Sequence, residues 1–455
     1  MQISSTTLII ISFLSAFYPR IISAYGVPSV INFVHFLVVP FALVVAIVKT
    51  PTKDRRQIAI SWEIIVGCLL LLGAMLASAL LNHAGEINVF LDYTLLAEPF
   101  LLLLAIICLP LSSEHLQRIR VCLLGSAVFN FLLACVQPFM LEVGLLPKSA
   151  YDGADAVQGV FYASGAGNYV SVSVSLSVAI YYFLYAKTVS IWFRIFCILA
   201  TFYQLILSDS KQILLVFMMA WLLLSVTKFS NVSKALLYLI TVIVFILCFY
   251  WAVENVDYEG FASFKWWLSR SELYGPDGVA IRTKTAGIRI VLSYYKSPLN
   301  WLFGLGPGHT IGRLGGWVLR DYGKLLLPLG ATVHPASTES WNTLLTSWLA
   351  VESSMFEPMF TWGGIWGDLG IIGLSAYLYL AYIVWTRLAK DDFSKFLLLT
   401  MFVYGWIITQ MEEPGQSLTV AILIGLQWHQ RQIAQQARQR ALQLNVDTNE
   451  FIELS

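Results

Sequence analysis

Charge is scarce in this sequence of 455 residues, of which only 12% are Asp, Glu, Lys or Arg while 58% are hydrophobic. Basic and acidic residues nearly cancel, at 28 against 27, so the chain carries no electrostatic footprint for nucleic acid. The high apolar fraction also excludes a chain of two or three water-soluble domains, which the length alone would allow.

Cysteine and internal repetition are limited as well. The six cysteines all fall in apolar runs, and none lies in the long polar segment 254–358, so we expect no disulfide and no metal cluster. No internal repeat is evident, which weakens the case for a transporter built from two inverted halves.

Long apolar runs are what the sequence does contain. They have the length of bilayer-crossing helices, so we predict an all-α polytopic membrane protein with about twelve transmembrane helices. The first run has no basic segment before it, which favours a span over a signal peptide. The expected spans cover residues 7–24, 28–48, 58–82, 93–112, 121–143, 166–186, 190–207, 212–227, 235–253, 359–386, 396–411 and 416–428.

Lysine and arginine are distributed unevenly between the loops, and this asymmetry predicts the orientation. Basic residues recur in every second loop: Lys49, Lys53, Arg55, Arg56, Arg118, Arg120, Lys187, Arg194, Lys228, Lys234, Arg387, Lys390, Lys395, Arg431, Arg438 and Arg440. The alternating short loops contain only Arg20, Lys148 and Lys211. Because basic loops stay on the cytoplasmic side, both termini are expected in the cytoplasm.

Four regions follow from this topology. Residues 1–253 hold nine spans, 254–358 form a large extracytoplasmic loop with short helices, 359–428 hold three spans, and 429–455 form a cytoplasmic tail. The polar, basic tail is expected to be a solvated or interfacial helix.

The large loop contains the first candidates for chemistry. Arg282, Arg289 and Lys296 are spaced seven apart and would form one stripe on a helix, either as a binding surface or as a solvated basic face. The segment "WLFGLGPG" (301–308) places three glycines around a proline, which predicts tight turns, with phosphate cradling as the alternative. It is not a P-loop, because no Lys-Ser or Lys-Thr follows the glycines.

Other candidates lie at the expected outer ends of spans. His334 precedes a proline, which favours an extended backbone, and histidine is the commonest proton carrier near neutral pH. Lys211 follows a capping segment at the start of an outward-facing helix, which indicates an anion site or a simple capped turn. Asp368 and Glu98 fall inside spans and should each have a partner. Tryptophans that suit sugar binding or an interfacial belt are Trp266, Trp267, Trp301, Trp317, Trp341 and Trp348.

Several of these motifs occur in a recognisable order. The segments are "GVFYASGAGN" (159–168), "GIR" (287–289), "SPLNWLFGLGPG" (297–308), a later His334, and "GDLGIIGL" (367–374). Over roughly residues 155–380 this order resembles the O-antigen polymerase and O-antigen ligase family of bacterial surface-polysaccharide assembly. The sequence departs from the family at Lys211, where the family has an arginine, and at Pro335, where it has an asparagine.

The resemblance implies a metal-independent glycosyltransferase without a cofactor. Its donor would be a glycan on a polyprenyl diphosphate, its acceptor a second lipid-linked glycan, and its further partners membrane lipid, a flippase and a chain-length regulator. Charge on the leaving diphosphate must be stabilised, so Arg289 is the first candidate, with Lys211 and Arg282 beside it. His334 is the expected base for the acceptor hydroxyl, and Glu339 or Glu352 are the alternatives.

Three other functions compete with this polysaccharide polymerase. A ligase would transfer the finished glycan to another acceptor, and only the product length separates the two. A lipid-glycan flippase or transporter would need charges near the bilayer midplane. A non-catalytic assembly subunit would tolerate loss of Arg289 and His334. In each case the expected location is the bacterial cytoplasmic membrane, with the active face outside.

Overall fold

The computed structural model describes residues 5–49, 54–147, 153–228, 232–256 and 278–453, with a few positions between 257 and 277. It is 82% helical, and the described residues contain no β-strand. The protein is therefore an all-α protein, and its long apolar helices are those of a membrane protein. Trp266 and Trp267 lie outside the described residues.

Twelve principal helices coincide with the expected apolar runs. Their bounds are α1 (Ser5–Phe17), α3 (His35–Lys49), α4 (Arg55–Asn82), α5 (Glu86–Cys108), α6 (Ser113–Glu142), α7 (Gly167–Tyr185), α8 (Ile191–Leu207), α9 (Lys211–Val226), α10 (Val232–Asn255), α18 (Thr361–Ile383), α19 (Asp392–Ile407) and α20 (Pro414–Glu453). Six stretches are long and apolar enough to cross a membrane: Ser29–Lys49, α4, α5, α6, α7 and Ser354–Leu388. The count of about twelve spans stays a prediction.

Local sequence explains where many of these helices begin and end. Asp54 caps α4 by accepting the N–H of Arg56 at 2.9 Å, and Asp391 caps α19 by accepting the N–H of Ser394 at 2.8 Å. α20 starts directly at Pro414, whose missing N–H costs nothing in the first turn. These three helices thus begin at a residue that satisfies a free backbone donor of the first turn or lacks one.

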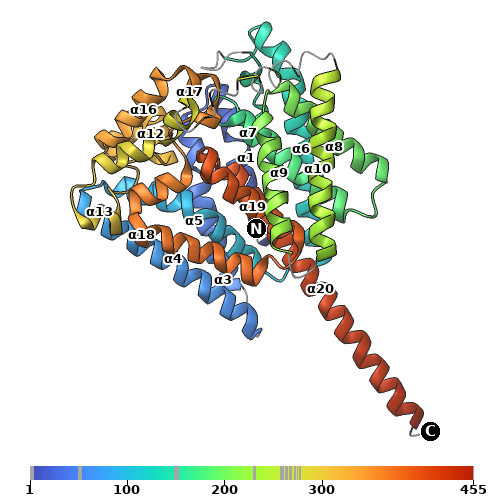
Figure 1. Ribbon diagram of the computed structural model, residues 1–455. Helices are drawn as coiled ribbons and strands as arrows, with labels where there is room; N and C mark the ends of the chain where they lie inside the picture. The colour runs from blue at the N-terminus through green and yellow to red at the C-terminus, as the bar shows by residue number, and fades with distance from the viewer. Residues whose placement is uncertain are drawn as a thin grey trace.

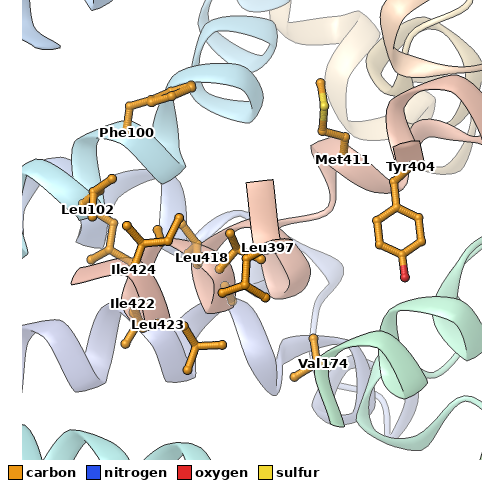
Figure 2. Packing of buried hydrophobic residues seen from close by; sticks show 14 of the residues in the cluster. Phe100, Leu102, Val174, Leu397, Tyr404, Met411, Leu418, Ile422, Leu423 and Ile424 are labelled. Carbon is orange, nitrogen blue, oxygen red and sulfur yellow. The ribbon is translucent and has the colours of Figure 1, made fainter. Parts of the chain in front are cut away.

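The core forms around α5 and α20, which pack on each other. Figure 2 shows Phe100 and Leu102 of α5 facing the apolar residues of α20, among them Leu418 and Ile424. Small residues allow close approach: a Cβ on Gly425 of α20 would lie 2.6 Å from Ile106 of α5. Because lipid tails are as apolar as leucine, such close packing contributes more to association here than hydrophobic burial does.

Short helices make up the segment between α10 and α18. They are α12 (Val279–Ser293), α13 (Pro298–Phe303), the π-helical turn η6 (Leu314–Val318), α14 (Leu319–Asp321), α15 (Gly323–Leu326), η7 (Leu327–Leu329), α16 (Pro335–Thr346), α17 (Trp348–Glu352) and η8 (Ser354–Phe356). Short helices are what the sequence predicts for the described part of the loop 254–358.

The molecule has two distinct ends. α12, α16 and α17 gather at one end, which we call the loop end, and α20 leaves the body at the other, which we call the tail end (Figure 1). The remaining short elements, α2 (Pro19–Ala24), η1 (Ser29–Phe33), η2 (Gly153–Ala156), η3 (Gly159–Phe161), the π-helical turn η9 (Val384–Leu388) and η10 (Thr409–Glu412), join the principal helices. The predicted tail is continuous with the last apolar helix, since α20 runs as one helix from Pro414 to Glu453.

Candidate functional site

The glycine segment after α13 packs into a break in α18. Gly370 interrupts that helix with φ 63°, and nearby carbonyls become free to accept hydrogen bonds. Leu305 donates its N–H to the Gly367 carbonyl at 2.8 Å, and Gly306 donates to the Asp368 carbonyl at 3.0 Å. The glycine segment is therefore a docked element of the body as well as a turn.

Glycine is needed for this approach. Gly304 has φ 72°, and a Cβ there would lie 2.3 Å from the carbonyl carbon of Asp368. The Asp368 side chain in turn accepts the N–H of Gly308 at 3.0 Å. The sequence predicts a partner for each of Asp368 and Glu98. The partner of Asp368 is thus a backbone amide. The partner of Glu98 is His35, whose Nδ1 lies 2.8 Å from a carboxylate oxygen of Glu98.

Gly363 and Gly367 of α18 are four residues apart, a GxxxG pattern that favours close packing of a second helix. In the structure this face packs against the same glycine segment. A Cβ on Gly367 would lie 2.6 Å from the Thr310 hydroxyl, and one on Gly363 would lie 2.7 Å from Ile311. These two glycines therefore pack against a loop, whereas their spacing predicts close packing against another helix.

This docking carries Arg313 into the interior. Its guanidinium lies 2.6 Å from a carboxylate oxygen of Glu413, and the two side chains are only 7% and 6% exposed. Its backbone N–H donates to Glu412 at 3.0 Å, and Ser164 donates its hydroxyl to Glu413 at 3.0 Å. The Nε of Arg313 has no hydrogen-bond partner among the described residues, so the guanidinium keeps donor capacity.

A second arginine lies beside the first. Arg20, in α2, donates to the Tyr322 hydroxyl at 2.7 Å, and Asn32 donates to the same oxygen at 3.0 Å. Arg20 and Arg313 both line a cavity of about 40 Å³, which we call the arginine cavity, together with Glu413 and Tyr322. The two guanidiniums converge on it from segments that are almost three hundred residues apart in sequence.

A carboxylate borders an adjoining, smaller space. Asp321, at the end of α14, lines a cavity of about 10 Å³ together with Arg20, Arg313 and Trp317. Burial raises the pKa of Asp321, and the nearby charges of Arg20 and Arg313 oppose that rise. A carboxylate at this position is a candidate to accept a proton from an acceptor hydroxyl.

Further carboxylates are buried next to this site. Asp92 of α5, Asp368 of α18 and Glu412 of η10 are each no more than 4% exposed. Asp92 lies close enough to the other two to interact electrostatically. Charge buried within a membrane protein is costly and usually marks function.

Among the predicted site residues, Arg282 and Arg289 lie together on the exposed face of α12. The Arg289 guanidinium donates to the Thr285 hydroxyl at 2.9 Å and to the Arg282 carbonyl at 2.8 Å. Both contacts are within its own helix. Neither arginine lines the arginine cavity.

Lys211 and Glu352 are brought together elsewhere. They line a cavity of about 410 Å³ beside α9 and α10, with Asp155 and Asp209. Lys211 forms an ion pair with Asp209, and burial together with Asp209 raises the pKa of Asp155 to about 6. With three carboxylates around one lysine, this cavity carries the wrong charge for a diphosphate.

His334 and Glu339 form a third group at α16. His334 caps that helix, because its Nδ1 accepts the N–H of Ala336 at 3.1 Å. Tyr294 lies between the two, with its ring 5.2 Å from the imidazole and its hydroxyl donating to Glu339 at 3.2 Å. The Nδ1 lone pair of His334 is therefore already used in the cap.

Sequence reasoning missed Arg313, Arg20 and Glu413 as site residues. One signal was available: Glu412 and Glu413 are adjacent acids between two apolar runs, and such acids need a basic partner. Arg313 ends the conspicuous segment "GLGPGHTIGR" (304–313), but nothing in its spacing indicates contact with residues a hundred positions away.

Comparison with known proteins adds no family. No protein-family model matches the chain, and no curated protein matches it.

Proposed function

We propose that this protein is a membrane-embedded glycosyltransferase that moves a glycan from a polyprenyl diphosphate onto a second lipid-linked glycan. One observation carries the proposal: two arginines from distant segments, Arg20 and Arg313, line one cavity. Guanidinium groups match diphosphate oxygens in charge and geometry. The proposal rests on this pair and not on Arg289, the candidate that the sequence predicts, because the contacts of Arg289 lie within its own helix.

The chemistry needs a base and a stabilised leaving group. The acceptor hydroxyl attacks the anomeric carbon of the donor, a new glycosidic C–O bond forms, and the bond from that carbon to the diphosphate oxygen breaks. The hydroxyl proton passes to Asp321, and the electron pair leaves with the diphosphate, whose charge Arg20 and Arg313 stabilise. Glu413 and Tyr322 hold the two guanidiniums in place.

The proposed setting is the bacterial cytoplasmic membrane. In this proposal the twelve principal helices all cross it, the two termini lie in the cytoplasm, and the loop end faces outward, where a flipped lipid-linked glycan is available. The alternation of basic loops supports that orientation.

Substitution of the arginines tests the proposal. Removing Arg313 alone would leave Glu413 buried without its charge partner and destabilise the fold, so the informative variant is the double substitution R313Q/E413Q. We expect it, and separately Arg20→Ala, to lower the rate of glycan transfer by about 10²- to 10³-fold. Arg118→Ala, an exposed arginine paired with Glu114, is the matched control and should retain activity.

The assay is transfer from a synthetic lipid-linked repeat unit in reconstituted vesicles. Long products indicate a polymerase, and a single transfer to a different acceptor indicates a ligase. Full activity in both arginine variants, with loss in Arg289→Ala, would contradict the site and return it to α12.

A transporter is the second candidate, because Asp92, Asp368 and Glu412 are buried together next to a broken helix. Buried carboxylates and interrupted helices are typical of proton-coupled transport. Asp92→Asn separates the two functions. Translocation of a lipid-linked glycan by a protein that catalyses no transfer, with that translocation lost in Asp92→Asn, would favour the transporter.

A further inference from the structure

A groove of about 950 Å³ opens beside α3, α4 and α5. α3 and α4 both pack on α5, which forms the floor. Its walls are mainly apolar, and the two titratable side chains His83 and Glu86 lie at the loop end. Leu80 on one wall is 79% exposed and Leu37 on the other is 69% exposed, so the groove is open toward the surrounding lipid.

Phe36 separates this groove from the arginine cavity, because its side chain lines both. It is 4% exposed. Its ring lies 6.0 Å from that of Phe33, which lies 4.8 Å from that of Tyr322, the residue that holds Arg20. A displacement of Phe36 is therefore coupled through two aromatic contacts to an arginine of the proposed site.

The two spaces differ greatly in capacity. At about 40 Å³ the arginine cavity has room for a few water molecules at most. A diphosphate with its first sugar cannot enter it unless a wall moves. Phe36 is the side chain that the walls of the two spaces have in common.

We propose that the groove holds the hydrocarbon chain of the polyprenyl diphosphate donor and that Phe36 is the positioning residue that admits its diphosphate to Arg20 and Arg313. This inference rests on the proposed function, because the head group is the donor's diphosphate. An apolar groove beside a pair of guanidiniums, of which that of Arg313 is buried, is complementary to a long hydrocarbon with an anionic end. A zwitterionic phospholipid has less reason to leave the bilayer for that site.

Photocrosslinking tests the location without requiring turnover. The probe is a polyprenyl diphosphate that carries a diazirine near the head of its chain, added to the purified full-length protein, and adducts are mapped by mass spectrometry. We expect adducts on α3, α4 and α5 that excess unlabelled polyprenyl diphosphate removes and that phosphatidylethanolamine does not. Equal competition by the phospholipid would show ordinary boundary lipid and overturn the inference.

A matched pair of tryptophans sharpens the test. Leu80→Trp fills the groove from its lipid-exposed wall, whereas Leu81→Trp adds the same bulk to the same helix at a side chain that does not line it. We expect labelling to fall about tenfold in the first variant and to stay unchanged in the second. Equal labelling of both would overturn the inference.

Phe36 itself has a distinct expected effect. Phe36→Ala opens the passage between the groove and the arginine cavity, so free diphosphate should compete more strongly with the probe. Phe36→Trp narrows that passage, so free diphosphate should compete less strongly. Transfer activity with adducts mapped elsewhere would refute the groove and leave the proposed function standing. Groove labelling in a protein that catalyses no transfer would refute the proposed function and leave the lipid site.

Discussion

At the scale of single residues, His334 shows how a predicted base can have another role. Burial, His309 and Lys296 lower its pKa from 6.5 to about 4, because each disfavours the imidazolium. The unfolded chain therefore binds the proton more readily between those two values, and stability should fall as the pH drops from 6.5 toward 4. His334→Asn keeps an N-cap acceptor without a titratable ring, so its melting temperature should fall less between pH 7 and pH 5.

Two comparisons complete that experiment, which is thermal unfolding in detergent with transfer activity measured alongside. His334→Ala removes the cap for Ala336 and should cost about 1 kcal/mol of stability at pH 7, where the imidazole is largely neutral. If His334→Asn folded normally but lost all activity, His334 would be the base that the sequence predicts.

At the scale of elements, the docked glycine segment makes a sharp prediction. Gly304 and Gly144 both have φ 72°, but a Cβ on Gly304 meets the Asp368 backbone at 2.3 Å, whereas one on Gly144 meets nothing within 4 Å. Alanine is disfavoured at a positive φ at both positions, and the ψ of −154° at Gly304 is adopted almost only by glycine. Gly144→Ala therefore controls for the positive φ alone. Gly304→Ala should unfold at a lower temperature than the control and lose transfer, because Arg313 moves with the segment.

The same segment shows what the sequence could and could not predict. The helices α4, α5 and α6 follow from apolar runs and caps, since those signals are local. The partners predicted for Asp368 and Glu98 exist, because a charge among apolar residues must be compensated. The pairing of Arg313 with Glu413 was not predictable, since it depends on how the glycine segment enters the break in α18.

At the scale of the whole molecule, the short basic loops lie at one end, where ion pairs join them to neighbouring helices. Arg387 lies 2.7 Å from Glu63, Arg431 lies 2.7 Å from Asp391, and Lys228 pairs with Asp392, all at the tail end. The loop end is joined by different contacts, such as Gln212 donating to Ser354 at 3.1 Å. Because the short basic loops lie at the tail end, the K/R bias of the short loops predicts a fixed orientation with the tail end in the cytoplasm.

Cysteine labelling measures that orientation. Val351, 65% exposed on α17, and Arg438, exposed on α20, mark the two ends. With a membrane-impermeant maleimide on intact spheroplasts, Val351→Cys should be labelled, Arg438→Cys should be labelled only after lysis, and the unsubstituted protein, whose six cysteines all lie in apolar runs, is the blank. The reverse pattern would place the arginine cavity near the cytoplasmic face. A transferase that uses flipped lipid-linked glycans would then be excluded, because its donor would be presented on the opposite side of the membrane.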